Sequence, residues 1–206
     1  MTPVFHDHPT PRPGRFRLRD GTPIVLRPLQ ADDRDLVVAG FDRLSPESRY
    51  RRFLSPTPRL TSSLLEFLMK VDDDDHFALV AVTAEEGTPS AVGVSRFARL
   101  ADPEAAEAAV TVIDEYQGQG AGAFLLDAIV LAARERGVTH FEGLVLADNA
   151  ASNAILAHAG AKFENDGNGV LRYRLELPET PADLPGHGVR HILKAFAAKL
   201  HRAPTV

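Results

Sequence analysis

The sequence contains no cysteine and no tryptophan, and only two of its 206 residues are methionine. Without cysteine there is no disulfide framework, thiolate zinc site, iron–sulfur cluster or cysteine nucleophile. No apolar run reaches the roughly 18 residues that a membrane-spanning helix needs, and the first 15 residues lack the apolar stretch of a secretory signal. Of the eight histidines, His6 and His8 lie in the proline-rich leader and His187 and His191 lie four residues apart, and neither pair has a third ligand nearby. We therefore expect a cytoplasmic protein that has no metal cofactor and no membrane partner.

The charges of the chain are close to balanced. Lys and Arg number 23 against 28 Asp and Glu, which gives a formal charge of −5 at pH 7. A surface of this kind is not typical of a nucleic-acid-binding protein, so we expect no nucleic acid partner. With 44% hydrophobic and 25% charged residues, the composition is that of an ordinary globular protein.

The chain divides into three parts. Residues 1–14 contain four prolines and are expected to form a flexible leader. Residues 15–178 carry alternating helical and strand patterns and are expected to form one domain. Residues 179–206 are a linker followed by an amphipathic helix over 189–202, which we expect to dock on its own domain or on a second copy in a homodimer.

Apolar periodicity predicts the elements of the central domain. Two short strands surround a turn at Asp20 and Gly21, and helices begin near Asp32 or Asp33, at Ser45 and at Thr61. Three strand patterns then follow one another as an antiparallel meander. The predicted strands span 15–19, 22–29, 77–82, 91–100, 106–113, 141–146 and 170–177, and the later helices span 121–136 and 150–158.

The glycine-rich segment QGQGAG at 117–122 follows a strand and opens a helix. Glycine lets backbone N–H groups approach an anion, and the helix end adds its positive dipole, so a pyrophosphate is the natural ligand. A P-loop would need Lys followed by Ser or Thr where Ala123 and Phe124 stand. A dinucleotide fold would place such a loop after its first strand, whereas a meander precedes it here, so this is the weaker interpretation. Tight packing without a ligand also fits the pattern.

Two motifs resemble those of the GNAT superfamily of N-acetyltransferases. QGQGAG at 117–122 resembles the family's Q/R-x-x-G-x-G/A motif, and NAASNAILAHAG at 149–160 resembles its N-x-x-A/S-x-x-L-Y-x-x-x-G segment. The segments IVLRP at 24–28, RLSPESRYRRF at 43–53 and VDDDDHFALVA at 71–81 are similar to the GNAT domain of bacterial protein-lysine acetyltransferases. The resemblance covers about residues 22–177.

The resemblance implies an α/β fold in which a mixed, twisted sheet of six to seven strands has helices on both faces. It implies an acetyl-CoA-dependent N-acetyltransferase whose acceptor is an amine, first a protein lysine and second a small amine. A binding module that senses acyl-CoA without turnover is the alternative. The residues implied to bind acetyl-CoA are Val110, Thr111 and Val112 on the strand, Gln117, Gly118, Gln119, Gly120, Ala121 and Gly122 in the loop, and Asn149 and Ser152 on the following helix.

Glu107 is the candidate general base, ten residues before Gln117. A lysine amine with a pKa of about 10.4 is almost fully protonated near neutral pH, so a base that removes its proton raises the rate. By periodicity alone an outward-facing glutamate is an equally good interpretation, and the resemblance favours the base. Neighbouring alanines predict a tight, partly apolar site that raises the carboxylate pKa. Asp114 and Glu115 are weaker candidates at a loop entrance.

The chain departs from the family pattern at Leu156, where many GNAT enzymes have a tyrosine that protonates the departing thiolate. Leucine carries no proton to donate, and His158 lies two residues further along, on another face of the helix. We expect water or the amine proton to serve instead. Asn149 is also a natural helix cap, and one residue can serve both roles.

Overall fold

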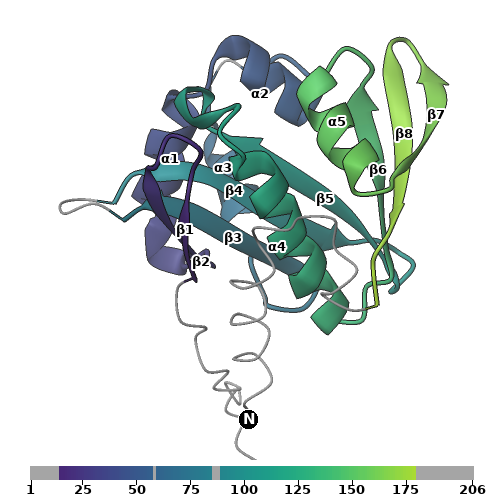
Figure 1. Cartoon of the computed structure of the whole chain (residues 1–206), viewed down its shortest axis with the longest axis horizontal. Coiled ribbons are helices and arrows are strands. Elements are labelled where there is room, and N and C mark those ends of the chain that lie inside the picture. The colour runs from purple at the N-terminus through teal and green to yellow at the C-terminus, as the bar shows by residue number, and fades with distance from the viewer. Residues whose placement is uncertain (1–13, 58, 85–88, 180–206) are drawn as a thin grey trace, which may run out of the picture.

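The computed structural model of this chain describes residues 14–57, 59–84 and 89–179. The leader expected over 1–14 lies outside these ranges except for Gly14, and the amphipathic helix expected over 189–202 lies outside them entirely. The described residues form one layered domain in which helices cover a twisted sheet (Figure 1).

The sheet contains eight strands in the order β1-β2-β3-β4-β5-β6-β8-β7. Neighbouring strands are antiparallel except for β5 and β6, which run parallel. The predicted meander is confirmed, because β3, β4 and β5 pair consecutively. The strands are β1 (Gly14–Arg17), β2 (Pro23–Pro28), β3 (His76–Thr83), β4 (Ala91–Arg99), β5 (Ala105–Val112), β6 (His140–Leu146), β7 (Lys162–Gly167) and β8 (Val170–Glu176).

Helices lie on both faces of the sheet, as the family resemblance implies. On one face α4 packs against β3, β4 and β5, and on the other α1 and α3 cover the central strands (Figure 1). Short 3-10 turns precede α1 and α4. The helices are α1 (Arg34–Asp42), α2 (Pro46–Phe53), α3 (Ser62–Met69), α4 (Ala121–Glu135) and α5 (Ala150–His158).

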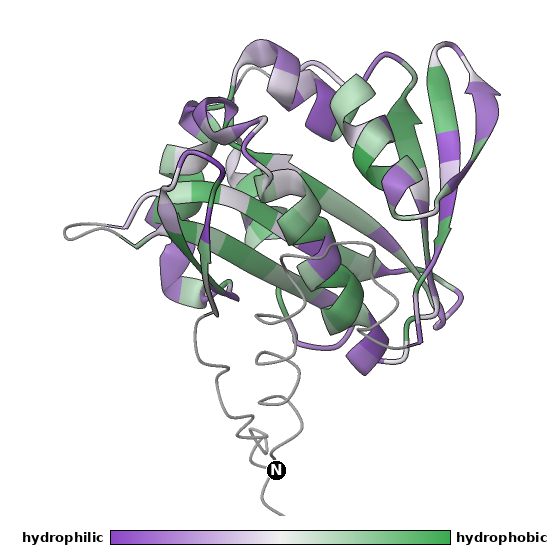
Figure 2. Ribbon diagram, viewed as in Figure 1, coloured by the Kyte–Doolittle hydropathy of each residue, from purple (hydrophilic) through white to green (hydrophobic). Residues whose placement is uncertain are grey.

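The eighth strand, β7, was not predicted. Its sequence KFENDG has one large apolar residue and five that are polar or glycine, and nearly all of it is exposed. It lies at the edge of the sheet, where Figure 2 shows mostly hydrophilic residues. An edge strand held by backbone pairing to β8 carries no apolar alternation, so the pattern that identifies buried strands is absent.

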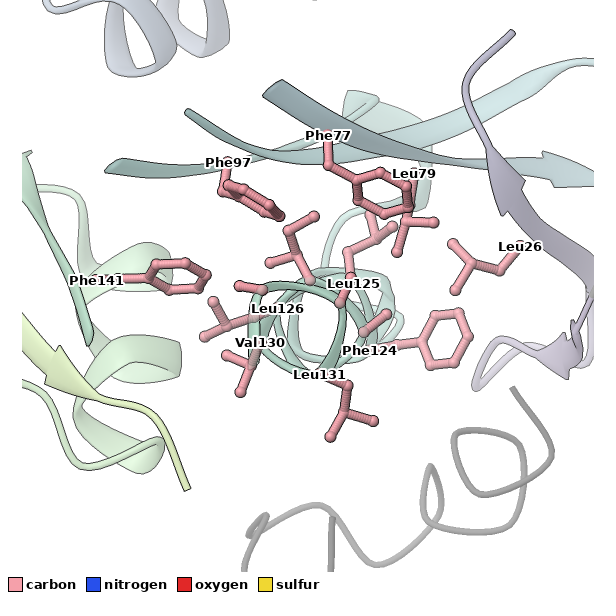
Figure 3. Packing of buried hydrophobic residues seen from close by; sticks show 14 of the residues in the cluster. Leu26, Phe77, Leu79, Phe97, Phe124, Leu125, Leu126, Val130, Leu131 and Phe141 are labelled. Carbon is pink, nitrogen blue, oxygen red and sulfur yellow. The ribbon is translucent and has the colours of Figure 1, made fainter. Parts of the chain in front are cut away.

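The core surrounds α4, which is apolar on nearly every side (Figure 3). Phe124 stacks on Phe16 of β1, with ring centroids 4.4 Å apart and planes 7° apart. Phe97 and Phe141 extend the same cluster across β4 and β6. Because strands and aromatic rings surround it, α4 keeps a fixed position, and so does the loop that leads into it.

The predicted helix starts at Ser45 and Thr61 are confirmed, because each hydroxyl accepts a backbone N–H three residues further on. The helix start predicted near Asp32 or Asp33 is also confirmed, since Asp33 is the N-cap of α1. Its carboxylate, however, makes no cap hydrogen bond to α1. It instead forms a two-pronged ion pair with Arg27 of β2, at 2.6 Å on both arms. Burial favours a higher pKa for Asp33. The hydrogen bonds from Arg27 and from the Gln30 N–H have the larger combined effect, so the pKa of Asp33 is lowered.

Candidate active site

The loop over residues 117–120 adopts a backbone that requires glycine. Gly118 and Gly120 have φ angles of +71° and +91°, in the left-handed region that other residues rarely enter. A Cβ at Gly118 would meet nothing within 4 Å, and a Cβ at Gly120 would meet only Arg19 Nε, at 3.9 Å. The loop is therefore open on the side where these side chains would lie, which leaves space for a ligand.

Arg19 of the β1–β2 turn orients the peptide groups of this loop. Its backbone N–H donates to the Gln119 carbonyl at 3.1 Å, and its Nη1 donates to the Gly118 carbonyl at 3.3 Å. In a trans peptide the carbonyl and the next N–H point in opposite directions. The N–H groups of Gln119 and Gly120 therefore point away from Arg19. Nothing in the sequence indicated this role, because the contact joins two distant turns.

The start of α4 adds further donors. Gly120 is the N-cap, and no side chain of the described residues caps this end. The first N–H groups of a helix have no partner inside the helix and carry its partial positive charge. Gly122 has a structural reason as well, since a Cβ there would lie 2.9 Å from Ile155 Cδ1 of α5. The loop and helix end together form a site suited to a phosphate group.

β5 and β6 pair only at their first residues. Ala105 and Ala106 lie opposite His140 and Phe141, and beyond them the strands diverge toward α2 and α5 (Figure 1). The Ile113 N–H donates to Val92 of β4, so odd-numbered residues of β5 direct their backbone groups at β4. Even-numbered residues, Val110 among them, direct theirs into the opening. We call this region, in which β5 and β6 are no longer paired, the β5–β6 gap.

Gln117 fixes the wide end of the gap. Its side-chain amide donates to the Val112 carbonyl at 3.1 Å and to the Ser48 hydroxyl of α2 at 3.2 Å. The side chain thus ties the loop to β5 and α2, and its Nε2 donors are used within the protein. A ligand at the loop would meet backbone groups there, as the motif predicts.

Asp114, which follows β5, binds the start of α2. Its carboxylate accepts the N–H of Ser45 at 3.1 Å, the Ser45 hydroxyl at 2.7 Å and the Ser48 hydroxyl at 2.9 Å. Burial favours a higher pKa for Asp114. These three hydrogen bonds have the larger combined effect, so the pKa of Asp114 lies below its ordinary value. Glu115 forms an ion pair with Arg43. Both acids are thus engaged in holding structure, which makes them weak candidates for a base.

Glu107 lies on β5 with its side chain exposed. The expectation of a tight, partly apolar site is wrong, because strand alternation turns Ala106 and Ala108 to the opposite face, against the α4 core. Glu107 shares its face with Ala109 and Thr111. Its negative charge acts on two neighbouring groups. Burial lowers the pKa of Arg52, and the charge of Glu107 opposes that change. Burial raises the pKa of Tyr173, and the charge of Glu107 adds to that rise.

A cavity borders this face of β5. Its walls are mostly apolar side chains from α1, α3, β3 and β4, and it extends to Ala109 and Thr111. Arg96 in its wall is 5% exposed, and its guanidinium donates to the last carbonyls of α3. Burial, assisted by the charge of Arg52, lowers the pKa of Arg96 to about 10. Arg52 also lines the cavity, and it donates no hydrogen bond and forms no ion pair among the residues that the structure describes.

The chain is similar to a known family of enzymes. The profile of the acetyltransferase (GNAT) domain matches residues 24–162, which is more than half of the chain. The chain belongs to the GNAT acetyltransferase family. It is therefore an acetyltransferase, of a class that draws its acetyl group from acetyl-CoA, and the family resemblance drawn from the two motifs is confirmed.

Individual relatives agree with this assignment. Acetyltransferase PA5475 of Pseudomonas aeruginosa is 34% identical over 78% of this chain and 87% of its own length. Acetyltransferase Pat of Mycolicibacterium smegmatis is 36% identical over 82% of this chain, which spans only half of that protein. The crystal structure of the GNAT domain of S. lividans PAT is 30% identical, with a TM-score of 0.73, and the match covers 80% of this chain and 97% of that domain.

Within this GNAT fold, the predicted acetyl-CoA residues fall into three groups. Residues 110–112 line or flank the β5–β6 gap, and residues 117–122 form the loop and the start of α4. Asn149 and Ser152 lie at the start of α5, where the Asn149 side chain accepts the Ser152 N–H at 3.2 Å. Asn149 is 6% exposed and serves as a helix cap. Leu156 packs into the α4 core.

Proposed function

We propose that this GNAT domain transfers the acetyl group of acetyl-CoA to an amine, with a protein lysine as the acceptor. The observation that carries the proposal is the alignment of the β5–β6 gap with the open glycine loop. The loop and the α4 N-terminus would hold the pyrophosphate, and the gap would receive the pantetheine along the backbone of residues 110–112. Asn149 and Ser152 would lie beside it. A cytoplasmic location remains part of the proposal.

In the proposed reaction the amine nitrogen attacks the thioester carbonyl carbon. Glu107 takes one proton from the ammonium group so that the free amine can attack, the new C–N bond forms and the C–S bond breaks, and the nitrogen then loses its second proton. A backbone N–H at Val110 would donate to the carbonyl oxygen while it carries negative charge. The thiolate leaves with the CoA, and water or the amine proton supplies its proton, since Leu156 has none to give.

The protein acceptor is supported by two features. Glu107 is exposed, so a lysine side chain that projects from another protein can reach it. The segments at 24–28, 43–53 and 71–81 also resemble the GNAT domain of bacterial protein-lysine acetyltransferases. An acyl-CoA sensor without turnover is the opposing hypothesis.

A second candidate acceptor is a small amine that bears a carboxylate. The cavity on the Glu107 side is apolar. The Arg52 guanidinium in its wall forms no direct ion pair with any described residue, and the charge of Glu107 acts on it. A carboxylate would pair with that guanidinium while the amine of the same molecule lies toward Glu107. Arg52→Lys keeps the charge and removes the planar fork, so an increased KM for such amines with unchanged lysine acetylation would favour this candidate.

The test of the catalytic proposal compares Glu107→Gln with Glu104→Gln, a matched change at an exposed glutamate on the approach to the same strand. CoA release is measured over pooled proteins and small amines, and modified lysines are identified by mass spectrometry. Glu107→Gln should bind acetyl-CoA with the wild-type affinity and lose about 10²- to 10⁴-fold in turnover. Equal turnover in Glu107→Gln and wild type would reject Glu107 as the base. Acetyl-CoA binding without turnover in any variant would favour the sensor.

A further inference from the structure

Tyr173 reaches across β6 to β5 from β8, two strands away. It pairs in register with Gly143 of β6 and is 4% exposed. A Cβ at Gly143 would lie 3.1–3.3 Å from two ring carbons and the hydroxyl oxygen of Tyr173. The absence of a Cβ at Gly143 therefore provides the space in which the Tyr173 ring crosses β6.

The hydroxyl of Tyr173 donates to the Ala108 carbonyl of β5 at 3.1 Å. Ala106 is the last β5 residue paired with β6, and Ala108 is the next one whose backbone groups point into the β5–β6 gap. The phenol thus takes the position at which a ligand lying along β5 would make its next hydrogen bond. The gap is closed at its narrow end by this side chain.

The following step rests on the proposed function. The glycine loop follows β5, so the CoA thioester enters the gap from the Val112 end and extends toward Ala108. With its carbonyl at Val110, the acyl carbons point toward the phenol. Val110 and Ala108 are two residues apart, which is about 7 Å along a strand. The phenol of Tyr173 occupies the end of that interval.

We propose that Tyr173 is the residue that restricts the acyl group to acetyl, because its ring and hydroxyl fill the space that a longer chain would need. Two observations support a space-filling role. The hydroxyl is held by Ala108, and burial, together with the charge of Glu107, raises the pKa of the phenol. A phenol that holds its proton this firmly is a poor proton donor to a thiolate, so Tyr173 does not replace the tyrosine that the family has at position 156.

The experiment compares wild type with Tyr173→Leu, which keeps an apolar side chain in the core and cannot reach Ala108. Acetyl-, propionyl- and butyryl-CoA are titrated by calorimetry, and kcat/KM is measured for each with one amine acceptor. One methylene in a hydrophobic pocket changes discrimination by about 10- to 200-fold. Wild type should prefer acetyl-CoA to butyryl-CoA at least tenfold, and Tyr173→Leu should reduce that preference at least tenfold.

Two further variants sharpen the result. Tyr173→Phe keeps the ring and should retain most of the acetyl preference, which separates occupied space from the hydrogen bond. Tyr50→Ala removes an exposed tyrosine of α2 and should change nothing. If Tyr173→Leu does not fold, as judged by circular dichroism, Tyr173→Met supplies the same test with a flexible side chain.

The proposal is overturned if a folded Tyr173→Leu binds acetyl-CoA and keeps the wild-type ratio of butyryl-CoA to acetyl-CoA. It is also overturned if wild type accepts butyryl-CoA as well as acetyl-CoA. The binding ratios answer this question even without turnover. Failure of the proposed function has a different result, in which no variant binds any of the three thioesters or none releases CoA.

Discussion

The backbone N–H of Arg19 donates to the carbonyl of Gln119 at 3.1 Å, and its guanidinium donates to the carbonyl of Gly118, which lies 99 positions further along the chain. The β1–β2 turn thus acts as a support for the glycine loop. It fixes which face of the loop presents N–H groups, and a bound pyrophosphate would meet that face. Pre-ordering of this kind lowers the entropy that binding costs.

Replacing Arg19 by alanine should weaken acetyl-CoA binding by about three- to tenfold, because a hydrogen bond contributes on the order of 1 kcal/mol and the backbone N–H of residue 19 remains. Isothermal titration measures the change. Arg17→Ala is the control, since Arg17 is exposed on the same hairpin and donates to Gly21 instead of the loop. Equal affinities for the two variants would contradict the role of Arg19.

Gly120→Asp should weaken acetyl-CoA binding by well over tenfold, which corresponds to more than about 1.4 kcal/mol. The variant places a negative charge beside the pyrophosphate site. Asp is among the residues that tolerate a left-handed backbone best, so the fold should survive. Gly160→Asp is a matched control at a φ of +94° in open space beyond α5. If Gly120→Asp binds as well as wild type, acetyl-CoA does not use this loop.

Asp127 of α4 makes the folding stability depend on pH. Burial raises its pKa to about 6, and the charge of His158 opposes the rise. Since the folded pKa exceeds the usual value of 3.8, the stabilisation from protonation is full below about pH 4 and is lost as the pH rises through 6. Asp127→Asn should therefore be more stable than wild type at pH 7 by about 2 to 3 kcal/mol, with a smaller difference at pH 4.

Urea denaturation at both pH values checks this prediction. Asp35→Asn, an exposed change on α1, should leave the stability at each pH within a few tenths of a kcal/mol of wild type. A constant offset between Asp127→Asn and wild type at the two pH values would show that the substitution acts through packing and not through the proton.

Asp114→Asn should lower both stability and acetyl-CoA affinity. The carboxylate accepts three hydrogen bonds from Ser45 and Ser48, and Ser48 in turn receives the amide of Gln117. Its pKa lies below the ordinary value, so this stabilisation is present above about pH 4 and is lost on further acidification. A loss of about 1 kcal/mol corresponds to a melting point lower by about 2 to 4 °C. Differential scanning calorimetry of this variant beside Asp42→Asn checks it, and equal melting points would contradict the prediction.

The sequence predicted the elements that depend on local chemistry. Ser45 and Thr61 start helices because their hydroxyls accept an N–H in the next turn, and that preference needs no tertiary contact. β3 and α4 have long apolar patterns because they are buried in the middle of the sheet and of the core. The glycines at 118 and 120 predicted a loop whose backbone can approach an anion, and both adopt the left-handed conformation that glycine allows.

Features without such a pattern were missed or mistaken. β7 is held by pairing to β8 and has no apolar alternation. Asp33 has the residue type of a cap, yet the Arg27 guanidinium binds its carboxylate from the neighbouring strand. Alanines beside Glu107 suggested burial, and strand alternation placed them on the other face of the sheet.

By itself the sequence determined the loop that suits a phosphate and most of the helices and strands, because glycine positions and apolar periods act through the local backbone. It indicated the family and its fold class through the resemblance of two motifs. Only the tertiary structure decided what surrounds that loop. Arg19 supports it and Tyr173 closes the β5–β6 gap, and each does so through a contact between residues far apart in the chain. Such hydrogen bonds form only when the fold brings the two groups close together. The packing of α4 and the register of the eight strands determine which groups come close.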